Sequence, residues 1–286
     1  MAIFRLLNQY FLKSVVGILC AFGVPLFFNI MFVLMGRNQY ATSLTVIISS
    51  GIMAETLMII PSLMIDLRKS LVLKRIGISK MSKHEFVLIL VVYFYAWVLA
   101  TIVFSFALFA ITTKIITPDL SVFTNHDVGA MIYGALILAT MSISSGVLIG
   151  LIFKNAIVAS TISFILIFFA LFTSGLLFPI GFMRQVDALV GINYVFYFNW
   201  PMLMMQESWG VVSANLATGA FDSIYGNVFD LSQGLIVNVP KITSLGIAKD
   251  FVLFDQFAKG WNLVAPYFAI GLTVGLIPVS FRWADR

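Results

Sequence analysis

Six long apolar stretches dominate this chain of 286 residues. Each has close to or more than the roughly 20 residues that a helix needs to cross the hydrocarbon core of a bilayer. The side chains are 61% hydrophobic and 10% charged, whereas soluble domains average about 45–50% and 25%. The sequence therefore predicts an all-α polytopic membrane protein with six transmembrane helices, forming a single transmembrane domain over residues 1–286. The predicted spans are residues 15–35, 41–65, 86–111, 128–153, 156–177 and 263–281.

The two ends of the chain are predicted to lie on the cytoplasmic side. Residues 1–14 carry apolar side chains near helical spacing with polar ones between them, which predicts a helix lying in the membrane interface. Eleven of the 17 Lys and Arg residues fall in the connections on the same side as both termini. Because basic residues concentrate in cytoplasmic loops, we expect a multi-pass protein of the cell membrane with both termini in the cytoplasm.

Two connections between the spans stand out by composition. Residues 66–85 form a strongly basic cytoplasmic loop. Residues 178–205 are apolar and aromatic but interrupted by Pro and Gly, which indicates re-entrant half-helices between spans five and six. The polar stretch 206–260 is expected to form an external cap. The aromatic and methionine residues of 196–205 are expected to anchor the chain at the interface.

The sequence lacks the residues of several chemistries. It contains no GxxxxGK[ST], HExxH or CxxC pattern and only two histidines, so we expect no ATP site, metal or other cofactor on this chain, and no enzymatic activity of its own. The basic residues follow the membrane topology and are not gathered into one soluble face, so no nucleic-acid partner is expected.

Residues 68–76 form a basic amphipathic segment within the cytoplasmic loop. One interpretation is that this segment lies at the anionic headgroups of membrane lipids. The other is that it docks a soluble partner and transmits force from it. The residues alone leave both interpretations open.

Two short runs bear on this choice. After the second span stand Arg68, Leu73-Lys74-Arg75, Met81-Ser82 and Glu85-Phe86, and after the fifth stands Ser174-Gly175-Leu176-Leu177-Phe178-Pro179. Together with the topology, these runs make the chain similar to the permease subunits of ATP-binding-cassette (ABC) exporters of the second type. Leu67, Lys69 and Lys80 depart from that family's pattern, which has two acids and a proline there.

The resemblance implies the transmembrane half of an ATP-driven exporter. A second permease copy, or a related chain, would complete the pathway, and separate ABC ATPase subunits would supply ATP and Mg. The resemblance also places an external gate at Phe178 and Pro179. The alternative function is a non-transporting membrane scaffold or sensor whose external cap binds a partner. By the resemblance, the residues coupled to the ATPase would be Arg68, Lys69, Leu73, Lys74, Arg75 and Ile76.

Two polar residues lie within predicted spans, Glu55 and Asn29. Charged groups at that depth are costly and face protein or a wet cavity. Each residue is therefore either a candidate for the translocation pathway or a hydrogen-bonding contact between helices. Small residues at four-residue spacing also predict close helix packing. They are Ser142, Gly146, Gly150, Gly271 and Gly275.

Overall fold

The computed structural model describes most of the predicted helical regions. The described residues are 2–35, 40–69, 82–116, 128–174, 176–177, 192, 195–207, 228–230, 235–237, 241–243, 246–248 and 255–280. The helices before the central part of the chain are α1 (Ala2–Lys13), α2 (Val15–Ile18), η1 (Leu19–Gly23), α3 (Val24–Met35), α4 (Tyr40–Met53), η2 (Ala54–Ile59) and α5 (Ile60–Lys69). The later helices are α7 (Lys83–Ile116), α8 (Val128–Ile152), α9 (Ala156–Thr173), α12 (Asn199–Glu207) and α14 (Asp255–Ser280).

Helices occur at all six predicted positions, but not all are long and apolar enough to count as spans. Among the described residues, Ser43–Lys69, Glu85–Ile115, Met131–Ile152 and Ala156–Thr173 meet that requirement. The bent pair Ile3–Lys13 and Val15–Met31 gives a fifth span if it is counted as one. In α14 the apolar part, Ala265–Ile277, is shorter. The described residues thus fit a membrane protein with four or five spans, and the sixth stays a prediction.

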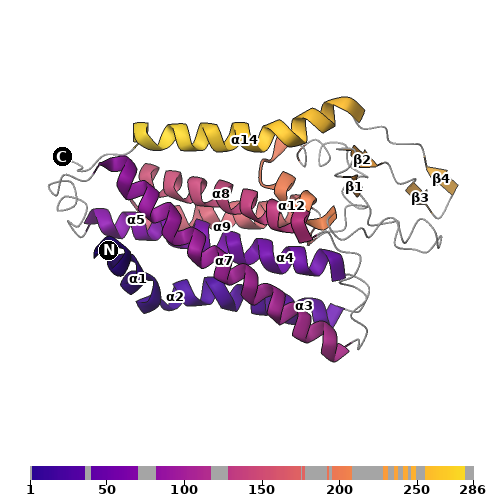
Figure 1. Cartoon of the computed structure of the whole chain (residues 1–286), viewed down its shortest axis with the longest axis horizontal. Helices are drawn as coiled ribbons and strands as arrows, with labels where there is room; N and C mark the ends of the chain where they lie inside the picture. The colour runs from indigo at the N-terminus through magenta and orange to yellow at the C-terminus, as the bar shows by residue number, and fades with distance from the viewer. Residues whose placement is uncertain are drawn as a thin grey trace.

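The continuous rod of α4, η2 and α5 forms the centre of the helical bundle (Figure 1). Its apolar window is 94% buried within the protein, compared with 33% for α9. The rod contacts α3, α7, α8 and α9. The polar residues that it carries between Ser43 and Thr56 are buried, so they face protein and not lipid.

Two π-helical segments, η1 and η2, interrupt the first two predicted spans. Each ends two residues before a proline, Pro25 or Pro61. A proline inside a helix lacks the N–H that would bond four residues back, and its ring clashes with that carbonyl. The wider π turn relieves this clash, so Pro25 and Pro61 explain both segments. The two π segments contact each other.

The amphipathic helix α1 turns sharply into α2 at Ser14. The two helices meet at 82°, and the Ser14 hydroxyl accepts a hydrogen bond from the Gly17 N–H at 3.1 Å. A Cβ on Gly17 would lie 3.0 Å from the Phe11 carbonyl oxygen, so a side chain there would require the backbone at the bend to shift by a few tenths of an ångström. Phe11 is buried and stacks on Trp97 of α7, with ring centroids 4.2 Å apart. If α2 and α3 cross a bilayer, α1 lies near its surface, as the sequence predicts.

Helix α7 begins at a capping box that follows the basic loop. The Ser82 N–H donates to Glu85 Oε2 at 2.8 Å, and the Glu85 N–H donates to Ser82 Oγ at 3.1 Å. This reciprocal pair satisfies two backbone donors at the start of the helix. The Ser82 and Glu85 positions of the family-like run therefore also have a local structural role.

The end of the bundle opposite α1 carries two short antiparallel ribbons (Figure 1). They pair β1 (Val228–Asp230) with β2 (Leu235–Val237), and β3 (Lys241–Thr243) with β4 (Gly246–Ala248). Both ribbons lie in the stretch predicted to form the external cap, where no strand was predicted. Apart from them, the regular structure among the described residues is helical.

Helix α12 packs inside the bundle, against α8. Asn199 and the Thr173 hydroxyl exchange side-chain hydrogen bonds at 3.0 and 3.1 Å. The expectation that the aromatic and methionine residues of this region anchor the chain at the interface was wrong for four of them, because their side chains fill space between helices. These four buried residues are Phe198, Trp200, Met202 and Met205.

Candidate functional site

Glu55 lies in the π-helical segment η2 and is completely buried. The Thr101 hydroxyl of α7 donates a hydrogen bond to Glu55 Oε2 at 2.7 Å. The other carboxyl oxygen, Oε1, has no hydrogen-bond partner among the described residues. The carboxyl group therefore joins the central rod to α7 through one oxygen and leaves the other available.

Three helices meet one turn away from Glu55, at Gly51. A Cβ at this position would lie 2.7 Å from Pro25 Cγ of α3 and 2.9 Å from Thr101 Cγ2 of α7. Real Cβ atoms do not approach other atoms so closely, so Gly51 allows α3 and α7 to reach α4 together. The same junction positions Thr101 to reach the carboxyl group of Glu55.

Two more buried polar groups follow on the same helix faces. Asn29 comes four residues after Pro25, and Ser105 comes four residues after Thr101, so each lies one turn beyond the Gly51 junction. Helices α3 and α7 run in the same direction (Figure 1), so both residues continue toward the same end of the bundle. Asn29 Nδ2 and Ser105 Oγ are buried without a hydrogen-bond partner among the described residues.

We call Glu55, Thr101, Ser105 and Asn29 the polar seam. It runs between α3, α7 and the central rod and contains three polar atoms without partners. A buried carboxylate is costly unless a proton or a cation neutralises it. No Lys, Arg or His among the described residues forms an ion pair with Glu55. The same residues contain no group of three or more His, Cys, Asp or Glu side chains that could hold a metal ion. The seam can therefore hold helices together through hydrogen bonds of a protonated, neutral Glu55.

The seam places both sequence candidates, Glu55 and Asn29, at one interface inside the bundle. The bond to Thr101 is the kind of contact that the structural interpretation of Glu55 expects. Thr101 and Ser105 were not among the site residues predicted from the sequence. Their four-residue spacing within the predicted span 86–111 places both hydroxyl groups on one face of the helix. This spacing alone does not indicate a contact with another helix, because such hydroxyl groups often donate hydrogen bonds to backbone carbonyls of their own helix.

Replacing Thr101 with Val should weaken the association of α7 with the central rod. The variant leaves both Glu55 oxygens without partners, and interhelical hydrogen bonds in membranes contribute about 0.6–1.7 kcal/mol. Glu55→Gln should change stability less, because the amide oxygen still accepts from Thr101. Unfolding in detergent with increasing dodecyl sulfate measures the effect. Thr112→Val is the matched control, since that hydroxyl donates to Leu108 O of its own helix at 2.7 Å; equal effects of the two Val variants would contradict the assignment.

Arg68, the first of the predicted coupling residues, connects the end of α5 to the end of α8. Its guanidinium donates to the Leu151 carbonyl oxygen at 2.5 Å and to the Phe153 carbonyl oxygen at 3.5 Å. The last carbonyls of a helix lack partners within the helix and carry partial negative charge, so a cation there is favourable. Lys69, the next residue, is exposed. Six predicted coupling and gate residues lie outside the described residues: Leu73, Lys74, Arg75, Ile76, Phe178 and Pro179.

The small residues of α8 lie against the central rod. A Cβ on Gly146 would lie 2.7 Å from the Thr56 carbonyl oxygen, and one on Gly150 would lie 2.8 Å from Met64 Cβ. Ser142, one turn earlier, is fully buried. In α14 the situation differs. A Cβ on Gly271 or Gly275 would meet no atom of a described residue within 4 Å, so these two glycines are not used for packing within the described part of this chain.

Comparison of the chain with models of known protein families, with characterised proteins and with solved structures gave no match.

Proposed function

We propose that this chain is the transmembrane half of an ABC exporter of the second type, which moves a substrate out across the cell membrane when separate ATPase subunits bind its cytoplasmic side. The resemblance in the two sequence runs and the bundle of apolar helices support this assignment. Both termini would be cytoplasmic, with six spans. ATP and Mg would bind the partner ATPase and not this chain.

The observation that carries the proposal is how the basic cytoplasmic loop is attached at both ends. Before residues 70–81, Arg68 fixes the end of α5 to the end of α8. After them, Ser82 and Glu85 fix the start of α7. A partner that pushes on the loop would therefore move three helices of the bundle together. This is the mechanical property that a coupling segment needs, and a loop that only rests on lipid headgroups does not require it.

The second permease copy has a surface available in this proposal. The outer face of α14 exposes Gly271, Gly275 and Leu272 among the described residues. Small residues of this kind allow close approach of another helix. The polar seam, in contrast, lies inside one subunit, so we assign Glu55 and Asn29 to helix association. The few charges within the spans favour an amphipathic or hydrophobic cargo over a highly anionic polymer.

The alternative is a non-transporting scaffold or sensor, favoured by the β ribbons in the stretch predicted to form the external cap. The proteins that remain bound after purification from the native membrane in mild detergent distinguish the two functions. The exporter is expected to retain a soluble ATPase with a P-loop. An external protein retained without any ATPase would favour the scaffold.

A further inference from the structure

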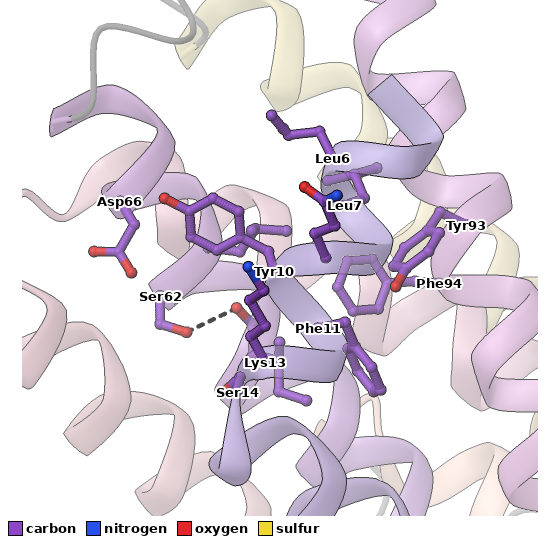
Figure 2. A pocket seen from close by; sticks show the side chains of 13 residues that line it. Leu6, Leu7, Tyr10, Phe11, Lys13, Ser14, Ser62, Asp66, Tyr93 and Phe94 are labelled. Carbon is purple, nitrogen blue, oxygen red and sulfur yellow. Dashed lines mark hydrogen bonds between the residues drawn. The ribbon is translucent and has the colours of Figure 1, made fainter. Parts of the chain in front are cut away.

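A pocket of about 420 Å³ lies between the amphipathic helix α1, the segment Ile59–Asp66 of η2 and α5, and α7 (Figure 2). Its size is within the range of pockets that bind small molecules. It is separate from the polar seam, and none of the predicted coupling residues of the segment 68–76 lines it. The residues that line it are Leu6, Leu7, Gln9, Tyr10, Phe11, Lys13, Ser14, Ile59, Ser62, Leu63, Asp66, Tyr93 and Phe94.

The pocket carries one positive and one negative side chain on different walls. Lys13 is at the end of α1, and Asp66 is on α5; both are exposed. Among the described residues neither forms an ion pair or a side-chain hydrogen bond. A ligand with two opposite charges would neutralise both.

The hydroxyl groups near these charges differ in availability. Ser62 already donates to the Ile59 carbonyl oxygen at 2.8 Å, the contact drawn in Figure 2. The Ser14 hydroxyl accepts from Gly17 at the bend. Tyr10 has no such contact within the described part of the chain, and its side chain is exposed. The groups free to bind a polar ligand are therefore Lys13, Asp66 and Tyr10.

The other walls are apolar. Leu7, Phe11, Leu63 and Phe94 are buried side chains that line the pocket. Because α1 meets α2 at 82°, the pocket lies at the depth of the membrane surface if α2 and α3 cross the bilayer. A site with two opposite charges, an apolar floor and this position suits an amphipathic molecule of the membrane more than a solute of the cytoplasm.

We propose that this pocket binds the headgroup of an ethanolamine phospholipid. The Lys13 ammonium and the Tyr10 hydroxyl would bind the phosphate, and the Asp66 carboxylate would accept hydrogen bonds from the primary ammonium of the lipid. A choline headgroup carries the same charges but has no N–H to donate. A glycerol headgroup has no cation for Asp66.

The proposal is tested by the lipids that the purified full-length chain retains. The chain is mixed with equal amounts of ethanolamine, choline and glycerol phospholipids, and the retained lipids are measured by native mass spectrometry. The ethanolamine lipid is expected to be retained about tenfold better than the choline lipid, the effect of about one charge-assisted hydrogen bond. Asp66→Asn should remove this preference, and Lys13→Gln should lower the retention of all three lipids. Both residues are exposed, so neither variant should affect folding.

Arg5→Gln is the matched control, because Arg5 is an exposed cation on the same helix α1 as Lys13 and does not line the pocket. It should leave the preference unchanged. Equal retention of ethanolamine and choline lipids, or an Asp66→Asn variant that keeps the preference, would overturn the proposal. Displacement of the lipid by soluble phosphoethanolamine at comparable concentration would show that the site takes a free solute, and would also overturn it.

Discussion

Reversing Lys74 and Arg75 to Glu is expected to abolish binding of the ATPase, and with it ATP-driven export, while the protein still inserts in the membrane. The two residues belong to the basic segment 68–76, which the family resemblance assigns to coupling. The change replaces two positive charges by two negative ones where an acidic or polar groove of the partner would dock. Insertion should be normal because the other basic residues of the cytoplasmic connections still set the topology.

The matched control is the reversal of Lys80 and Lys83, which changes the charge of the same loop by the same amount outside the segment 68–76. It should retain the ATPase. The amount of ATPase that copurifies with each variant, relative to the amount of inserted chain, is the measurement. ATPase retention in the Lys74 and Arg75 variant equal to that of the native chain would rule out the coupling role. Loss of the ATPase from both variants would show that the total charge of the loop, and not the segment 68–76 in particular, determines binding.

A single methyl group at Gly146 is expected to destabilise the bundle strongly. The Cβ of Gly146→Ala would lie 2.7 Å from the Thr56 carbonyl oxygen, and backbone in the buried segment η2 cannot move away as a flexible side chain can. Overpacking of this kind costs about 1–3 kcal/mol. The variant should therefore unfold at a lower temperature in detergent than the native chain.

Gly271→Ala, in contrast, is not expected to destabilise the bundle. A Cβ there meets nothing within 4 Å among the described residues, and Ala favours a helix over Gly by about 1 kcal/mol. The unfolding temperature of the monomeric chain should be unchanged or higher, because this face of α14 is proposed to contact only the second permease copy. An unfolding temperature for Gly146→Ala equal to that of Gly271→Ala would show that α8 does not pack closely on the central rod.

The positions of the helices could be predicted because a chain in lipid must satisfy its backbone hydrogen bonds within each segment. The predicted stretches beginning at Val128 and Ala156 coincide with the starts of α8 and α9. The last helix extends further, since α14 begins at Asp255 and not near the predicted residue 263. Its polar first turns have no hydropathy signal, so only the structure shows that they are helical.

The contacts of the candidate residues could not be predicted in the same way. The sequence identified Glu55 as exceptional, but its partner Thr101 is 46 residues away and on another helix. Helical periodicity shows which residues share a face, not which face meets which neighbour. The burial of Phe198 and Trp200 could not be predicted either. The sequence does not distinguish an aromatic residue that faces lipid at a membrane interface from one that faces protein.

The π segments show a similar limit. A proline inside a helix disturbs it, and Pro25 and Pro61 both follow a π segment. How a helix absorbs a proline depends on its neighbours, however, and here η1 and η2 contact each other. Glu55 lies in the wider turn of η2.

The most direct measurement of the central claim is the subunit stoichiometry of the intact complex purified in mild detergent from the native membrane. The proposed function predicts two copies of a permease chain with two copies of a soluble ATPase that carries a P-loop. A stable oligomer of this chain that contains no ATPase, under conditions that preserve its bound lipids, would contradict the assignment as an exporter subunit.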